Sequence, residues 1–311
     1  MQSQLFRDFD AFAESVRDVE SKMMLRNPKR RIWSISHVDL PSIHVQLGRL
    51  GSGNIAQGEL RSDGYLIYMP LTDACEYSVN GTVLDKNSFA ILEPGCEFCV
   101  STKVEHDWCA ATFPTHMFGD LVEPTSGSEQ KTVRVSRANR QLANQFRTAV
   151  GQIMTIAANC SQFESAPASK SAAAELLKVA SVVVGQRQAG GPKQQGRPRL
   201  QRQEIIRRSK ELLEQRDGQR VRIEQLAAAA EVSERTLRTA FSEYFGVGPV
   251  RYLQLRQLHQ VHRALRAADP AAVSVSDVLV AHGEWEFSRF ASRYRRLFGE
   301  LPSQTLRTNG R

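Results

Sequence analysis

The chain has 311 residues, 41% of them hydrophobic, which is enough material for two folded domains. Its net charge of +8 is unevenly distributed along the chain. From Lys193 onward there are 22 Lys and Arg and 13 Asp and Glu, whereas the first 192 residues contain 19 and 20. We therefore expect a polyanion-binding part joined to a neutral one. The sequence holds no apolar run long enough to cross a bilayer and no signal-peptide core, which predicts a cytoplasmic protein without a membrane partner.

Short alternating segments between about residues 30 and 118 predict a β-rich region, preceded by a short helix in "FRDFDAFAESVRDVE". Turn signals separate the segments, among them Asn80-Gly81 between "CEYSV" and "TVL", a pair typical of β-hairpins. Several short strands at this spacing predict a sandwich or a barrel.

Helical periodicity begins near Ser136 and continues to Gly185, where two helices are expected. They could cover the barrel or form a dimer surface, and periodicity does not separate these two roles. Residues 186–202 are rich in Gly, Gln, Pro and Arg and predict a linker.

Consecutive short helices follow in residues 203–311. "RIEQLAAAAEVSERTLRTAFSEYFG" has an Ala-rich helix, a short break and a second helix that begins at Ser233, a favoured N-cap. Two short helices joined by a tight turn describe a helix-turn-helix. The residues expected to hold its helices together are Ile223, Leu226, Val232, Leu237 and Phe241.

The same pattern returns 53 residues later, which predicts two copies of one unit, near residues 222–246 and 275–299. The matched pairs are Leu226 and Leu279, Val232 and Trp285, Leu237 and Phe290, Phe241 and Tyr294, Phe245-Gly246 and Phe298-Gly299, and Pro249 and Pro302. On this alignment Trp285 is expected in the core. A long helix is expected between the copies.

Two helix-turn-helix units in a strongly basic segment predict binding to duplex DNA, because each second helix can enter a major groove. The outward residues of the first recognition helix are Arg235, Arg238, Thr239 and Ser242. Those of the second are Ser288, Arg289, Ser292, Arg293 and Arg296. We expect the first unit to carry more sequence specificity and the second to contact mostly phosphates. An arginine-rich face is also typical of a solvated surface or of a helix on a membrane.

These stretches resemble the AraC/XylS family of bacterial transcription regulators. The resemblance covers about residues 203–307 and is carried by "RIEQLAAAAEVSERTLRTAFSEYFGVGPVRYLQLRQLHQVHRAL" and "VSVSDVLVAHGEWEFSRFASRYRRLFGELPSQTLR". One departure is Gly283-Glu284, where the family usually has Gly-Phe, and Trp285 is expected to take over the packing.

The resemblance implies seven helices in this domain and promoter binding that activates, less often represses, transcription, with RNA polymerase as a partner. It also implies base contacts early in each recognition helix, at Arg235, Arg238 and Thr239, then at Ser288 and Ser292. Many family members carry a cupin-like, effector-binding β-barrel and a helical dimerisation segment in front. We therefore expect an α+β protein in which residues 1–185 form the sensor, with the dimerisation segment at 136–185.

The N-terminal half offers no enzyme or cofactor motif. Its histidines are scattered, no H-x-H occurs, and the single pair Cys96 and Cys99 lacks a second pair for zinc, so we expect no metal, no cofactor and no catalytic residue. The five cysteines are expected to be buried apolar residues. A small effector of unknown identity is expected in the barrel, lined by Tyr65, Tyr68, Tyr77, Phe98 and Trp108.

The sequence thus predicts an effector-responsive, DNA-binding transcription activator that forms a homodimer. Two alternatives remain open at this point. One is a regulator controlled by a protein partner without a small ligand, and the other is an enzyme with an accessory DNA-binding tail.

Overall fold

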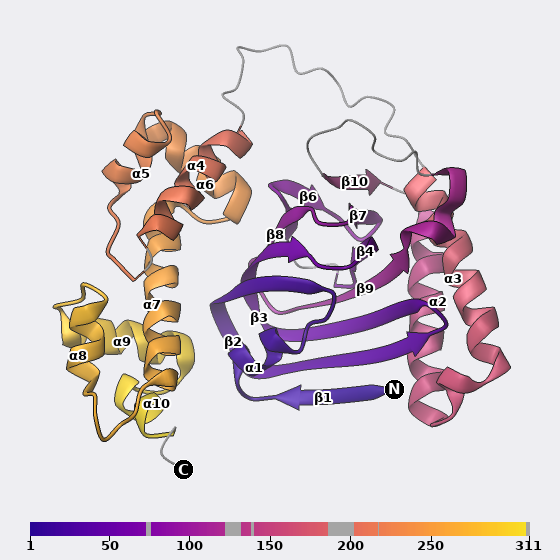
Figure 1. Cartoon of the computed structure of the whole chain (residues 1–311), viewed down its shortest axis with the longest axis horizontal. Helices are drawn as coiled ribbons and strands as arrows, with labels where there is room; N and C mark the ends of the chain where they lie inside the picture. Colours follow the sequence, from indigo (N-terminus) through magenta and orange to yellow (C-terminus); the bar gives the residue numbers. More distant parts are fainter. Residues whose placement is uncertain (73–75, 122–131, 138–139, 186–201, 217, 309–311) are drawn as a thin grey trace. The chain divides into compact units, whose positions relative to one another are not determined.

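A computed structural model describes residues 1–72, 76–121, 132–137, 140–185, 202–216 and 218–308 (Figure 1). The chain forms two compact units, one of Met1–Met23 and Asn27–Gln194, the other of Met24–Arg26 and Gln195–Arg311. The predicted linker lies outside the described residues, apart from Arg202. Within the described ranges, every helix is too short or too polar to pass through a bilayer.

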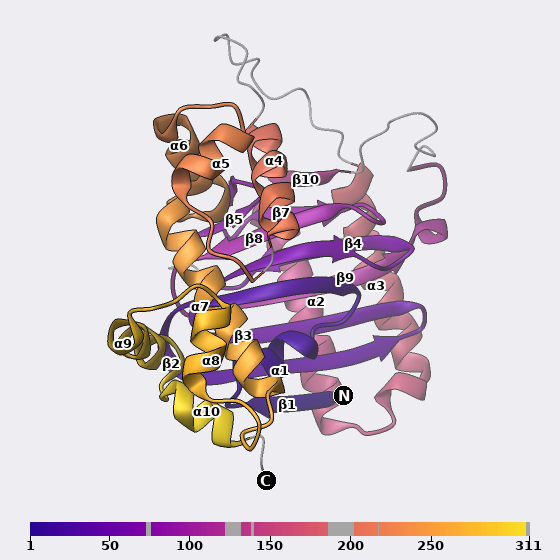
Figure 2. The same cartoon turned by 60° about the vertical axis from the view of Figure 1, so that its left-hand side comes forward.

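The first unit is built on one ten-stranded antiparallel sheet that curls into a nearly closed barrel (Figures 1 and 2). The sheet order is β10-β7-β4-β9-β3-β8-β5-β6, with β2 paired to β3 and β1 paired to β2. The strands are β1 (Gln2–Phe6), β2 (Val19–Leu40), β3 (Ile43–Leu60), β4 (Gly64–Pro70), β5 (Tyr77–Val79), β6 (Thr82–Leu84), β7 (Ser88–Leu92), β8 (Glu97–Thr102), β9 (His106–Pro114) and β10 (Val133–Arg137). The barrel expected from the strand pattern is confirmed.

Strand β3 is long enough to pair with two partners in succession. Its first half lies against β9, from His44 opposite Thr112 to Leu50 opposite His106. Its second half lies against β8, from Ile55 opposite Ser101 to Glu59 opposite Glu97. This change of partner lets the sheet curl.

The predicted hairpin at Asn80-Gly81 is confirmed: Val79 pairs with Thr82, and Asn80 and Gly81 both have positive φ, 48° and 78°. Such a pair of left-handed residues matches the twist of the two strands they join. The predicted first helix is shorter than expected. It is α1 (Phe9–Glu14), and β1 and the start of β2 flank it, so the strands begin well before residue 30.

Helices α2 (Arg140–Asn159) and α3 (Pro167–Gly185) pack side by side against the outside of the sheet (Figure 2). Alternation along β4 explains this layer, because Tyr65, Ile67 and Met69 belong to the core shared with the helices. Helix η2 (Phe163–Ser165) joins α2 to α3, and helix η1 (Thr115–Leu121) follows β9. The apolar inner faces of α2 and α3 therefore close one side of the barrel.

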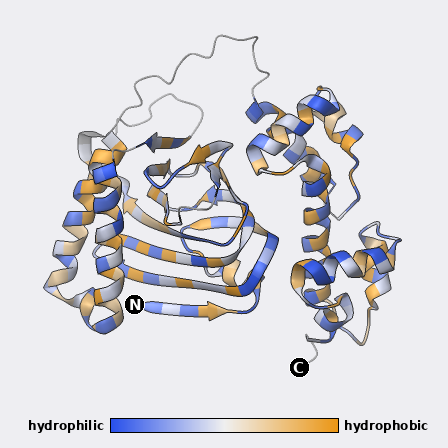
Figure 3. Cartoon of the chain, turned by 180° about the vertical axis from the view of Figure 1, so that it is seen from behind, coloured by the Kyte–Doolittle hydropathy of each residue, from blue (hydrophilic) through white to orange (hydrophobic). Residues whose placement is uncertain are grey.

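The second compact unit of the chain is a helical domain. It has seven helices among the described residues, as the family resemblance implies. They are α4 (Arg202–Gln215), α5 (Ile223–Ala229), α6 (Glu234–Phe245), α7 (Pro249–Ala267), α8 (Val275–Ala281), α9 (Phe287–Phe298) and α10 (Pro302–Thr308). Figure 3 shows hydrophobic and hydrophilic residues alternating along them. Helix α7 packs against α6, α8 and α10, so it connects the two predicted helix-turn-helix units.

Candidate nucleic-acid interface

The first helix-turn-helix unit consists of α5, a short turn and α6. At the start of α5, Oε1 of Gln225 accepts a hydrogen bond from the backbone N–H of Arg222 at 2.9 Å. In the turn, Glu231 has a positive φ of 55°. At the start of α6, Oγ of Ser233 accepts from the N–H of Thr236 at 3.2 Å, which confirms the predicted N-cap. The hydrogen bonds at both helix starts fix how α6 leaves the turn.

The predicted contact residues of α6 all lie on its exposed side. They are Arg235, Arg238, Thr239 and Ser242. The opposite side is buried in the domain through Leu237, Ala240 and Phe241. Arg238 forms a surface ion pair with Glu234 at 2.6 Å, and a pair of this kind is worth little in solution. The face is therefore polar and cationic, as an interface with DNA requires.

The second unit repeats this arrangement with α8 and α9, but its turn is one residue longer. In the first unit the N–H of Val232 bonds to the carbonyl of Ala227 at 3.0 Å. In the second unit the N–H of Glu284 bonds to the carbonyl of Leu279 at 2.9 Å. Val232 and Glu284, which make these equivalent hydrogen bonds, are 52 residues apart. The glycines that end the two recognition helices, Gly246 and Gly299, are 53 residues apart, and both have positive φ. The extra residue lies between Glu284 and the start of α9.

This register corrects the expected pairing of Val232 with Trp285. Glu284 occupies the position of Val232, and it is only 2% exposed. Trp285 belongs to the lengthened turn, and it is 70% exposed instead of buried. It does not take over the packing of the turn, because it points away from the core.

Four of the five predicted contact residues of α9 are exposed: Ser288, Arg289, Ser292 and Arg296. Arg293 differs, because its Nη2 donates to Oε2 of Glu284 at 2.9 Å and its guanidinium lies over the ring of Phe290, 5.8 Å from the ring centre. The structure therefore ties the half-buried Arg293 to the turn, unlike the exposed arginines of α9.

The inner side of α9 also carries polar groups that residue spacing did not indicate. The hydroxyl of Tyr294 lies 2.5 Å from Nδ1 of His262 on α7 and 2.7 Å from Oγ1 of Thr305 on α10. His262 also stacks on Phe298, with ring centres 4.1 Å apart. These contacts connect α9 to α7 and α10.

Arg251, at the start of α7, is a further cation near this surface. Partial burial and the charge of Arg296 lower the pKa of the Arg251 guanidinium. No pattern in the sequence indicates this neighbourhood, because Arg251 and Arg296 stand on different helices far apart in the chain. A phosphate is the kind of anion that two close guanidinium groups attract.

The barrel holds a small cavity of about 60 Å³, lined by α1 and by strands β2, β3, β4, β7, β8 and β9. Three predicted effector residues line it: Tyr68, Phe98 and Trp108. The rings of Tyr68 and Trp108 stack with centres 5.8 Å apart. Gly48 leaves room for this arrangement, because a Cβ there would lie 2.4 Å from Cε2 of Trp108. The indole thus lies directly against the β3 backbone.

The other two predicted residues, Tyr65 and Tyr77, do not line the cavity. Tyr65 faces the layer of helices and contacts the ring of Phe118, 5.5 Å away between ring centres. Tyr77 donates its hydroxyl hydrogen bond to the carbonyl of Asp107 at 2.5 Å. Strand alternation places Tyr65 on the opposite face of β4 from Tyr68.

Two polar side chains at the cavity, Asn54 and His106, form hydrogen bonds within the barrel. Oδ1 of Asn54 accepts from Oγ1 of Thr102 at 2.7 Å, and Nδ1 of His106 lies 2.9 Å from the carbonyl of Val104. Burial lowers the pKa of His106 to about 4, so its ring is neutral at physiological pH. The cavity is therefore uncharged and mainly apolar.

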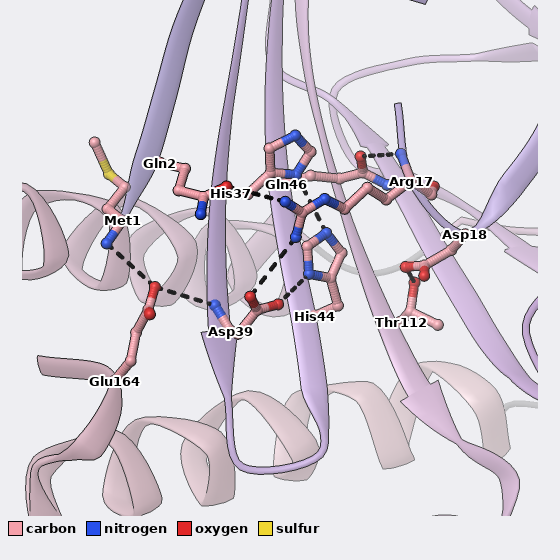
Figure 4. A network of polar contacts seen from close by, with 10 residues as sticks. All are labelled: Met1, Gln2, Arg17, Asp18, His37, Asp39, His44, Gln46, Thr112 and Glu164. Atoms are coloured by element: carbon pink, nitrogen blue, oxygen red, sulfur yellow. Dashed lines mark hydrogen bonds and ion pairs between the residues drawn. The ribbon is translucent and has the colours of Figure 1, made fainter. Parts of the chain in front are cut away.

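Two histidines that look scattered in the sequence meet at the β2–β3 hairpin (Figure 4). Nδ1 of His37 lies 3.2 Å from Nε2 of His44, whose Nδ1 lies 2.5 Å from Oδ1 of Asp39. Burial, with the charge of Arg17 next in size, lowers the pKa of His37 to about 4. The backbone N–H of Asp39 bonds to Oε1 of Glu164, which also pairs with the N-terminal amine at 3.1 Å. The network fastens β1 and the hairpin to the α2–α3 connection.

Within the described ranges, no group of three or more His, Cys, Asp and Glu side chains has an arrangement that could hold a metal ion. Cys96, Cys99 and Cys109 are buried, as expected, and burial raises the pKa of Cys96 and Cys109 to about 12. Cys160 is exposed, against the expectation, and Cys75 lies outside the described residues.

Comparison with known proteins bears on the helical unit. Residues 226–308 match the model of a helix-turn-helix domain family. Over 96 residues the chain is 35% identical to "XylDLEGF operon transcriptional activator 2" of Pseudomonas putida, a match that covers 31% of this chain and 61% of that protein. Over this domain, the chain is therefore similar to regulators of the AraC/XylS type. A "Probable thc operon regulatory protein" of Rhodococcus erythropolis is 33% identical over 104 residues, or 33% of this chain and 31% of that protein.

The chain thus matches about three fifths of the first relative and under a third of the second. Among solved structures, that of the AraC-like transcriptional activator CuxR aligns with 83% of this chain and 94% of its own, at 10% identity and a TM-score of 0.45. That of ToxT from Vibrio cholerae aligns with 94% of this chain and 98% of its own, at 8% identity and a TM-score of 0.30. Within the matched residues, the turn before α9 contains the buried Glu284.

Proposed function

We propose that the chain is a sequence-specific, DNA-binding transcription regulator that activates a promoter in response to an effector. The observation that carries the proposal is the pair of helix-turn-helix units in one domain, each with an exposed polar and cationic face on its second helix. The relatives in Pseudomonas putida are transcriptional activators by name, which supports activation over repression.

The proposed DNA contacts divide by chemistry. Arg235, Arg238, Thr239 and Ser242 of α6 are proposed to contact bases and the adjoining backbone, since Arg pairs with guanine and Thr contacts the thymine methyl. On α9, Ser288 and Ser292 are proposed for bases and Arg289 and Arg296 for phosphates. Arg293 is left out of this set because Glu284 holds it.

Binding of the purified full chain to genomic fragments at several salt concentrations tests the proposal. A regulator retains one fragment at about 0.2 M salt and shows a steep salt dependence, because each phosphate contact releases counterions. Arg235→Ala should weaken that fragment selectively. Lys170→Ala removes one exposed cation from α3 and serves as the charge-matched control. Equal binding of all fragments by the wild-type chain would contradict sequence-specific recognition.

We further propose the division into a sensor of residues 1–185, a linker of residues 186–202 and a DNA-binding domain of residues 203–311. The outer faces of α2 and α3 support a homodimer through residues 136–185: Ile156 is 48% exposed, Val182 is 50% exposed, and a groove of about 870 Å³ runs between the two helices. A dimer would place two DNA-binding domains at paired sites and raise their effective concentration there. Light scattering on Val182→Glu tests it, with Lys170→Glu, at a position that does not line the groove, as a control on the same helix.

The effector is proposed to bind in the barrel cavity against Tyr68, Phe98 and Trp108, and the uncharged lining favours an apolar molecule. Ala110→Leu should fill the cavity and abolish the response at the operator found above. A second candidate is regulation by a protein partner that binds the surface of the barrel or of helices α2 and α3, with no small-molecule ligand. It is favoured by the cavity's size, about 60 Å³, because benzene occupies an engineered cavity of roughly 150 Å³. A normal response in the filled variant would support the partner and contradict the small effector.

A further inference from the structure

The turn before α9 contains a buried carboxylate. Glu284 is 2% exposed, and both of its oxygens are used inside the unit. Oε1 accepts a hydrogen bond from the backbone N–H of Glu286 at 3.1 Å, and Oε2 accepts from Nη2 of Arg293 at 2.9 Å. One side chain therefore connects the last residue of the turn to the middle of the recognition helix.

The first unit has no charge at these two positions. Glu284 is equivalent to Val232 by the hydrogen bonds of the turn, and Arg293 is equivalent to Ala240 by the helix-ending glycines. Val232 is half-buried and Ala240 is buried. The chain thus contains both versions of the same junction, one apolar and one ionic.

Arg293 is held on two sides. Beyond the contact with Glu284, its guanidinium lies over the ring of Phe290, and its Nε is buried without a hydrogen-bond partner within the described part of the chain. A guanidinium in this position gains from the carboxylate and from the ring face. Moving it out to a phosphate would leave the carboxylate of Glu284 buried and uncompensated, which is costly.

We propose that Glu284 is a positioning residue for the second recognition helix, and that it keeps Arg293 out of contact with DNA. The carboxylate orients the first turn of α9 through the N–H of Glu286, where a negative charge also suits the helix dipole. It fixes the axis of α9 through Arg293. Ser288, Arg289 and Ser292 are thereby presented to DNA, and Arg293 is not. This inference rests on the proposed DNA-binding function.

The salt dependence of DNA binding counts phosphate contacts and so tests the role of Arg293. Each contact contributes about 0.9 to the slope of log K against log salt concentration. In the full chain, Arg293→Ala should leave the slope unchanged, whereas Arg289→Ala should lower it by about 0.9. Glu284→Gln releases Arg293 and should raise the slope by up to about 0.9. A loss of slope in Arg293→Ala equal to that in Arg289→Ala would overturn the proposal.

Stability of the same variants tests the positioning role without DNA. Glu284→Gln and Arg293→Ala should each lower the midpoint of thermal unfolding. Glu284→Val/Arg293→Ala, which copies the first unit, should recover most of that loss, since an apolar pair can replace a buried ion pair. If the double variant were no more stable than the less stable of the two single variants, the proposed coupling between Glu284 and Arg293 would be overturned.

Trp285 supplies a spectroscopic readout next to the junction. It is 70% exposed, whereas Trp33 and Trp108 are buried in the barrel, so changes at the turn alter the exposed component of the emission. Glu284→Gln should change that component, and the double variant should restore it. An unchanged emission in Glu284→Gln contradicts the positioning role. If the wild-type chain bound no DNA, the proposed function would fail, while the unfolding and emission measurements would still decide the positioning role.

Discussion

The two helix-turn-helix units have nearly the same backbone but differently composed interiors. In the first, Phe241 lies among the rings of Phe245 and Tyr252, with ring centres 5.1 and 5.5 Å away. In the second, the equivalent Tyr294 carries a hydroxyl that bonds to His262 and Thr305. When one contact is lost from an apolar interior, the cost in stability is proportional to the contact area lost. When one member is lost from a buried polar network, its hydrogen-bond partners are left unsatisfied as well. The second unit is therefore the one in which a small chemical change has a disproportionate effect.

The largest expected effect is in the first unit. Phe241→Ala removes a fully buried ring and should lower the free energy of unfolding by about 3–5 kcal/mol, from lost burial and the cavity left behind. Urea unfolding of the full chain, followed by circular dichroism, measures it. A cost below about 1 kcal/mol would mean that the aromatic cluster is not the core of this unit.

The second unit should respond to the loss of a single oxygen atom. Tyr294→Phe keeps the ring but leaves His262 and Thr305 without their shared partner, so we expect a cost of about 1–3 kcal/mol in the same unfolding measurement. Phe241→Tyr is the matched control, since it adds a hydroxyl to the apolar interior and should also destabilise the chain. If Tyr294→Phe were neutral, the two interiors would be equivalent in energy despite their chemistry.

The two exposed faces should differ in sequence discrimination. Arg235→Ala should cost roughly 1–3 kcal/mol of discrimination between the preferred and a mismatched DNA fragment, the value of a bidentate contact with guanine. Ser288→Ala, early in α9, should cost less, because a serine makes a weaker base contact. Competition binding at fixed salt measures both. A larger loss from Ser288→Ala would reverse the assignment of specificity to the first unit.

The smallest expected effect compares the starts of α6 and α9. Ser233→Ala removes the N-cap bond to Thr236 and should cost about 1 kcal/mol. The N-cap position of α9, Glu286, makes no side-chain cap bond, so Glu286→Ala should change stability by less than about 0.5 kcal/mol. Equal losses in thermal unfolding would show that α9 depends on its own N-cap side chain and not on Glu284.

Much of the helical domain could be predicted because its signals are local. The N-cap serine, the glycines that end α6 and α9, and the apolar spacing of each helix are properties of neighbouring residues. The extra residue in the second turn cannot be detected from the sequence, for a physical reason. Val278 and Leu279 are both buried, so either register of α8 gives an apolar match. The 53-residue alignment therefore predicts Trp285 in the core, although the longer turn carries it to the surface.

The sequence predicts the barrel fold, but it does not predict which residues line the cavity. Its hairpin at Asn80-Gly81 and its alternating segments are visible in the sequence. Strand β4, in contrast, is buried on both faces, one toward the cavity and one toward α2 and α3, so hydrophobicity cannot separate Tyr65 from Tyr68. The contact between His37 and His44 depends on hairpin register, and the pairing of Glu284 with Arg293 depends on the turn length. Both lie beyond what residue spacing alone can indicate.

Helix α7 has a consequence for the geometry of any DNA site read by one chain. Its 19 residues span about 28 Å, and this length sets the separation of the two helix-turn-helix units. Copies that follow each other along one chain are not related by a two-fold axis, and palindromic sites mirror two-fold symmetry. A site read by both units of a single chain would therefore have a direction. If such a site were reversed at a promoter, the first and the second helix-turn-helix unit would exchange the ends of the site that they occupy.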